Sequence, residues 1–191
     1  MFELTKYTDD VWFWENIFKN PKGIIDYILK NDSKWTKHHR KNGELLGSGI
    51  VLTSHDEPEL WEEITNSLNI CFLQYIDDHN LSRKNSKLDL RAIEIRKMTG
   101  FCSGMPPHTD SFMEYDSETK DLEIEFTLIC YFNEDFDGGE INLPELSISI
   151  KPKPGSLLMF PQNHKHSVND LISGERFCSV IFGLKSLGSG N

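Results

Sequence analysis

The sequence predicts a mainly β fold with flanking helices, an antiparallel sandwich or barrel with a helical N-terminal layer. After about residue 88 the chain consists of short β-rich or alternating runs separated by turns, including Asp137-Gly138-Gly139. Before residue 88, apolar residues recur at helical spacing. The spacing is clearest at Leu60, Ile64, Leu68, Phe72 and Ile76.

Two helical segments are expected in the first half. Residues 11–30 carry apolar side chains at helical spacing, broken near Pro21 and Gly23. Residues 58–81 form the stronger helix, with Pro58 and Glu59 suited to its first turn. The strands are expected at residues 90–96, 123–132, 146–150, 155–160 and 177–184. No repeat or linker interrupts the chain, so we expect one domain over residues 1–191, with helical support over about 1–87 and a catalytic β core over about 88–186.

Composition limits the classes of partner. Of the 191 residues 38% are hydrophobic, enough to fill a core, and the formal net charge of −10 disfavours binding to a phosphate backbone. The basic stretch at residues 34–41 is interpreted as a solvated loop, and His38 and His39 as surface residues. No signal peptide and no apolar run of about 18 residues is found, so we expect a cytoplasmic protein with no membrane partner.

The cysteines do not suggest a structural site. Cys71, Cys102, Cys130 and Cys178 are widely spaced and form no C-x-x-C pair, so neither a zinc knuckle nor a disulfide framework is expected. Cys102 lies near the metal motif described next, and inert packing or loop exposure is favoured there over a redox-sensitive thiol.

A candidate metal motif occurs at His108-Thr109-Asp110. Iron that activates oxygen needs two imidazoles and one carboxylate on one face, and residues i and i+2 of a strand point to the same side. About one such match is expected by chance, and a second one, His55-Asp56-Glu57, is interpreted as a loop or helix start before Pro58.

Further candidates lie downstream of this motif. His164 and His166 compete for the place of third ligand. Arg176 follows within an apolar, β-rich run, where a guanidinium needs a buried partner such as a carboxylate of an organic co-substrate. Two ligands, a later histidine and then an arginine form a much rarer combination than the pair alone.

In order and spacing these segments resemble the prolyl 4-hydroxylase-like branch of the 2-oxoglutarate/iron(II) dioxygenases. The resemblance covers roughly residues 90–184, about half of the chain. It rests on MTG…HTD at 98–110, YFNEDFDGGE at 131–140, PGSLLMF at 154–160 and HSV…GER at 166–176. It implies a double-stranded β-helix (jelly-roll, cupin-like) core, and Fe(II), 2-oxoglutarate and O2 as cofactor and co-substrates, with ascorbate as a candidate reductant.

The resemblance also implies residue roles. His108, Asp110 and His166 would bind iron, with the ten-residue interval to Arg176 favouring His166 over His164. Arg176 and Tyr131 would bind the distal carboxylate of 2-oxoglutarate. Its pocket would be lined by Ile129, Ile141 and Val168, with Thr127 as a polar contact.

One position departs from the family pattern. Met98 stands where many relatives have a tyrosine that contacts 2-oxoglutarate, and residues 98–108 are expected to form a loop over the site. The implied activity is hydroxylation of an unactivated C–H bond with release of succinate and CO2. The substrate would be a peptidyl proline or another protein side chain. The alternatives are a free amino acid, small metabolite or nucleobase, or a non-catalytic metal- or ligand-binding β-barrel.

Overall fold

The computed structural model describes residues 2–31, 34–39, 43, 45–100, 104–110 and 121–187. Its described part contains two antiparallel sheets, and the fold class predicted from the sequence is confirmed. The main sheet has the order β1-β2-β12-β8-β14-β6-β4-β3, and β5 and β9 pair with β14. The smaller sheet has the order β11-β10-β13-β7.

The strands of the main sheet are β1 (Glu3–Lys6), β2 (Trp12–Glu15), β3 (Thr36–His39), β4 (Leu45–Leu52), β5 (Ser86–Leu88), β6 (Ile93–Thr99), β8 (Leu122–Tyr131), β9 (Phe136–Gly138), β12 (Ser156–Pro161) and β14 (Leu171–Ser186). Those of the smaller sheet are β7 (Met105–His108), β10 (Ile141–Leu143), β11 (Ile148–Ile150) and β13 (His166–Val168). The helices are α1 (Pro21–Lys30), α2 (Pro58–Asp78) and the short 3-10 turn η2 (Pro144–Leu146).

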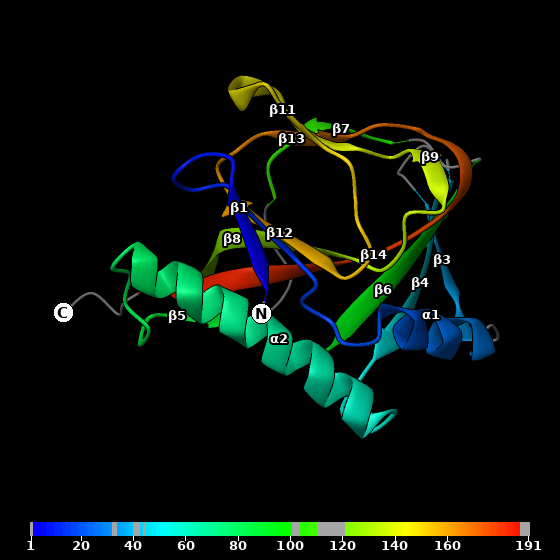
Figure 1. Cartoon of the computed structure of the whole chain (residues 1–191), viewed down its shortest axis with the longest axis horizontal. Helices are drawn as coiled ribbons and strands as arrows, with labels where there is room; N and C mark the ends of the chain where they lie inside the picture. The colour runs from blue at the N-terminus through cyan, green and yellow to red at the C-terminus, as the bar shows by residue number, and fades with distance from the viewer. Residues whose placement is uncertain are drawn as a thin grey trace.

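The main sheet separates two apolar cores. In Figure 1, α2 runs along one side of this sheet, and β7, β11 and β13 lie on the other side. Alternation along β8 explains the division: Leu128 and Cys130 pack in the cluster shared with the helices, whereas Ile129 and Tyr131 pack in the cluster between the sheets. The chemistry-bearing side chains of β8 therefore point into the space between the two sheets.

Helix α2 is the element that the sequence predicts best. It begins at Pro58 as expected and ends at Asp78, three residues before the predicted end. Its buried side chains include Ile64, Leu68 and Phe72, which occupy the predicted apolar stripe. No helix in the described part of the chain is long and apolar enough to cross a membrane.

The prediction for residues 11–18 is wrong. Trp12–Glu15 form strand β2, which pairs with β12. Trp12 and Trp14 pack toward the helices while Phe13 packs between the sheets, so both faces of the strand are buried. A short run that is apolar on both faces has no period that distinguishes it from a buried helix segment.

The first 87 residues are accordingly not a purely helical layer. They contribute β1 to β5 to the main sheet, and Thr36–His39, expected as part of a loop, form β3. Residues 40 and 41 of that basic stretch lie outside the described part of the chain. Side chains from both halves share the core cluster under the main sheet, which supports the proposal of one domain over residues 1–191.

Candidate metal centre and pocket

Three predicted ligands lie together between the two sheets. His108 ends β7, His166 begins β13, and the two residues face each other in the antiparallel register. Asp110 follows two residues after His108, just beyond the end of the strand. The ligand atoms of the three side chains all lie within 4.8 Å of one another.

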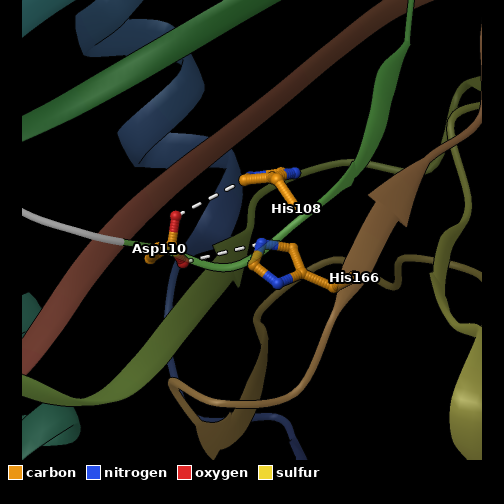
Figure 2. Close-up of side chains that lie close together, drawn as sticks. All are labelled: His108, Asp110 and His166. Carbon is orange, nitrogen blue, oxygen red and sulfur yellow. Dashed lines mark ion pairs between the residues drawn. The ribbon is translucent and has the colours of Figure 1, made fainter.

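The Asp110 carboxylate lies against both rings. Its Oδ1 is 3.7 Å from His108 Nε2, and its Oδ2 is 3.5 Å from His166 Nε2, as the dashed lines in Figure 2 show. Two ligands of one transition-metal ion, each bonded at about 2.0–2.2 Å, lie between roughly 3 and 4 Å apart. The spacing of these groups therefore fits a single ion.

Backbone carbonyls orient the two imidazoles. His108 Nδ1 lies 2.9 Å from Pro106 O, and His166 Nδ1 lies 3.3 Å from His164 O. Because a carbonyl oxygen only accepts hydrogen bonds, each Nδ1 carries the proton and each Nε2 presents a lone pair. Burial lowers the pKa of His166, and the nearby Asp110 carboxylate offsets this only in part. The neutral ring that results is the form that binds metals.

Beside the three ligands lies a cavity of about 460 Å³. Its wall includes Arg176, Tyr131 and Met98, together with Ile129 and Val168. Such a volume, with mostly apolar walls and a few convergent polar groups, is typical of a small-molecule site.

Arg176 provides a buried cation in this cavity. Its side chain donates from Nη1 to Gly139 O at 2.6 Å and from Nη2 to Met98 Sδ at 2.7 Å, while its Nε is buried and has no hydrogen-bond partner among the described residues. A buried guanidinium nitrogen without a partner is costly, and a carboxylate ligand would satisfy it. The residues present therefore fit 2-oxoglutarate.

Tyr131 supports the same interpretation. Its side chain is almost fully buried on β8. Burial raises its pKa well above the usual value, an effect that the charge of Arg176 only partly offsets. The phenol therefore remains protonated and is able to donate a hydrogen bond to an anion beside Arg176.

Comparison with known proteins agrees with this geometry. Residues 95–182 match the family described as the 2OG-Fe(II) oxygenase superfamily. A PKHD-type hydroxylase from Crocosphaera subtropica is 32% identical over 75 residues. The segment aligned with the hydroxylase is 38% of this chain and only 34% of the hydroxylase.

Solved structures of other proteins share the fold of this chain. A viral collagen prolyl hydroxylase from Paramecium bursaria Chlorella virus-1 aligns with a TM-score of 0.67 and 15% identity, covering 94% of this chain and 97% of that one. A Pseudomonas putida prolyl-4-hydroxylase aligns with a TM-score of 0.69 and 12% identity over 92% of each chain. The predicted double-stranded β-helix is thus confirmed as the fold.

The structure distinguishes the two competing histidines. His164 Nε2 lies 2.9 Å from Asp10 Oδ2, outside the group formed by His108, Asp110 and His166, and its side chain is only 18% exposed. It is therefore a half-buried partner of the β1–β2 connection and not the loop-surface residue expected. Burial raises the pKa of Asp10, but hydrogen bonds from His164 and Thr8 outweigh this and hold the pKa below its usual value.

Several other predicted residues are placed differently. Ile141 is not among the cavity-lining residues: it is fully buried in the core between the sheets and pairs with Val168 from the next strand. Met98 lies on β6, and Met105–His108 form β7, so residues 98–108 are not simply a loop. Thr127 lines the cavity, but its hydroxyl donates to Asp110. Cys102 lies outside the described residues.

The structure also shows features that the sequence did not reveal. His38 and His39, predicted as surface residues, line the outer part of the cavity because β3 is a strand of the main sheet. Gly139, predicted as a simple turn residue, provides the carbonyl that holds Arg176. The Gln162 side chain donates to the backbone carbonyl of Asp110. No spacing rule signals such contacts, because they join segments far apart in the sequence.

The second histidine–acid match, His55-Asp56-Glu57, lies at the helix start as expected, with Glu57 immediately before the first residue of α2. Asp56 accepts hydrogen bonds from the backbone N–H and hydroxyl of Thr53, just before α2. Within the described ranges, the only group of metal-ligating side chains is the one at His108, Asp110 and His166.

Proposed function

We propose that the protein is an Fe(II)- and 2-oxoglutarate-dependent dioxygenase that hydroxylates an unactivated C–H bond and releases succinate and CO2. One observation carries the proposal. A buried guanidinium with an unpartnered Nε lies in the same cavity as two histidines and a carboxylate whose ligand atoms fit one ion. The match of residues 95–182 to the 2OG-Fe(II) oxygenase superfamily supports it.

The residues of this chain would divide the work. His108, Asp110 and His166 would hold iron from one side and leave its other positions facing the cavity. When bound, iron would supply the activation of O2 that couples oxidative decarboxylation of 2-oxoglutarate to hydroxylation. Arg176 and Tyr131 would orient the distal carboxylate of the co-substrate, and the apolar side chains of Ile129 and Val168 would keep water from the reacting atoms. Ascorbate is the proposed reductant.

For the substrate we propose a peptidyl proline or another protein side chain. The support is the likeness of the fold to proteins named as prolyl hydroxylases, including one from Trichoplax adhaerens solved with a peptide fragment (TM-score 0.63, 14% identity). A small metabolite, or binding without catalysis, is the alternative that the experiment must distinguish.

The first experiment adds Fe(II) and 2-oxoglutarate without oxygen and follows the weak visible charge-transfer band of the chelate. We expect the band in the wild-type protein, its loss in His166→Ala, and its retention in His164→Ala, the matched control outside the cluster. Full binding by His166→Ala would contradict the proposed metal centre.

The second experiment admits oxygen and measures succinate in the presence and absence of a poly(L-proline) peptide. Stimulation by the peptide, abolished in His108→Ala and Asp110→Ala, is the expected result. Metal and 2-oxoglutarate binding without succinate under either condition would favour the non-catalytic binder.

A further inference from the structure

The carboxylate of Asp110 is held from the main sheet by one hydroxyl. Thr127 Oγ1 donates a hydrogen bond of 2.7 Å to Asp110 Oδ2. The Gln162 side chain donates to the backbone carbonyl of the same residue. Both the backbone and the side chain of Asp110 are therefore fastened by residues that follow it in the chain and belong to different elements.

Thr127 is a rigid anchor for this contact. It lies within β8, where it pairs with Phe160 of β12 on one side and with Phe182 of β14 on the other. Its side chain is fully buried. A hydroxyl fixed in the middle of a sheet holds its acceptor with far less freedom than one on a loop.

The single hydroxyl proton of Thr127 argues against the role that the resemblance implies for this residue, which is a contact with 2-oxoglutarate. A threonine hydroxyl has one proton to donate, and that proton is directed at Asp110. Carboxylate and keto oxygens only accept hydrogen bonds. Contact between Thr127 and the co-substrate would therefore have to break the bond to Asp110.

The two oxygens of Asp110 are otherwise almost equivalent. Oδ1 lies 3.7 Å from His108 Nε2, and Oδ2 lies 3.5 Å from His166 Nε2. Either oxygen, or both, could thus approach an ion bound by the two rings. If both bound, two rings and two oxygens would take four of six positions, leaving fewer than a chelating co-substrate and oxygen need.

We infer that Thr127 is a positioning residue: its hydrogen bond weakens Oδ2 as a metal ligand and so favours a single metal bond from Asp110 through Oδ1. The hydroxyl acts through the carboxylate and does not touch the co-substrate. With one bond from each of the three side chains, three coordination positions of a bound ion would remain open toward the cavity. The inference rests on the proposed function, because it concerns the ligand set of the same metal centre.

Three variants test it with Co(II), which reports its coordination through its visible spectrum. Thr127→Val keeps the size and the β-branched shape but removes the proton, whereas Thr127→Ser keeps the proton. Thr65→Val is the matched control, since Thr65 is a buried threonine whose hydroxyl bonds to Trp61 O within α2. Thermal unfolding confirms that each variant is folded, and Thr127→Ala replaces Thr127→Val if the latter does not fold.

We expect Thr127→Val to change the Co(II) spectrum before 2-oxoglutarate is added. Its Kd for 2-oxoglutarate in the Co(II)-loaded protein should rise about 10- to 100-fold, the same range by which loss of a metal ligand's partner lowers metal affinity or activity. Thr127→Ser and Thr65→Val should keep the wild-type spectrum and a Kd within about threefold of wild type, roughly the scatter expected for independent contacts.

Two results would overturn the inference while leaving the proposed function intact. One is a Thr127→Val protein with the wild-type spectrum and Kd. The other is a Thr127→Ser protein as impaired as Thr127→Val, which would assign the effect to packing. A wild-type protein that takes up no Co(II) would instead refute the metal centre, and the proposed function with it.

Discussion

Replacing Arg176 by methionine should separate stability from co-substrate binding. Arg176 is 4% exposed, and within the described residues the structure gives its guanidinium no carboxylate partner. Arg176→Met keeps an unbranched apolar stem but removes the charge and the donors. We expect the free protein to remain as stable as the wild type or to become more stable, while binding of 2-oxoglutarate is largely lost.

The expected magnitudes follow from the contacts. The hydrogen bond to Gly139 O, made by a charged donor, contributes about 1.5–3 kcal/mol. Burying the unpaired charge costs several kcal/mol, so the two terms roughly cancel. The free energy of unfolding should thus stay within about 1 kcal/mol of the wild-type value, which limits the Tm change to about 2–4 °C. Loss of a buried charge pair with the ligand costs about 2–5 kcal/mol, which is roughly 30- to several-thousand-fold in Kd.

The assay is thermal unfolding of the metal-loaded protein with increasing 2-oxoglutarate, which yields both quantities from one experiment. Arg176→Lys should lie between wild type and Arg176→Met, because it keeps the charge but not the fork. Arg83→Met removes an exposed arginine paired with Asp77 and should leave the Kd unchanged. An Arg176→Met protein that binds 2-oxoglutarate normally would refute the reasoning.

Three further predictions follow from single contacts. Gly139→Ala, at φ +70° with its added Cβ 3.4 Å from Arg176 Nη1, should cost about 1–2 kcal/mol and raise the Kd for 2-oxoglutarate. Gly43→Ala is the control, because Gly43 also has a positive φ (+87°) but its added Cβ meets no atom of the described residues. It should lower the free energy of unfolding through backbone strain and leave the Kd for 2-oxoglutarate unchanged. Asp10→Asn should remove less than about 1 kcal/mol at pH 7, since Asp10 is partly exposed. Because the folded pKa of Asp10 is lowered, that stabilisation exists above the unfolded pKa of about 3.9 and disappears as pH falls through the folded value. Denaturation curves in which Asp10→Asn loses more than about 1 kcal/mol at pH 7, or in which the wild type keeps its advantage over Asp10→Asn at acid pH, would contradict it. Burial raises the pKa of Cys71 to about 12, so iodoacetamide should alkylate it only after unfolding, as peptide mass spectrometry would show.

Patterns that extend over a few neighbouring residues are enough to predict α2, the β-rich half of the chain and the His108–Asp110 pair. The stripe on α2 needs only the helical period, and the β-rich half needs only alternation and turn residues. The His108-Thr109-Asp110 spacing brings two ligand side chains together whether or not the strand continues, which it does not beyond His108. These features are encoded within a few residues of one another.

The remainder depends on contacts between distant segments. Trp12–Glu15 form a strand because β12 lies beside them, although their own pattern is equally compatible with a helix. The Thr127 hydroxyl has one proton and several possible acceptors, and only the approach of Asp110 decides which one receives it. Likewise, Ile141 is one strand away from the cavity wall that Val168 forms, a difference that hydrophobicity does not reveal.

The position of β2 also has a consequence for how the chain reaches its native state. Trp14 pairs with Leu4 of β1 on one side and with Leu157 of β12 on the other, so the edge of β2 that faces β12 stays unpaired until most of the chain has been synthesised. Until β12 is made, the N–H and C=O groups on that edge of β2 are able to recruit a strand from another molecule. If β2 is disturbed, the matching edge of β12 stays open in the same way. Deletions or fusions that disturb Trp12–Glu15 should therefore reduce the yield of monomeric protein through aggregation, even though no residue of this segment touches the cavity.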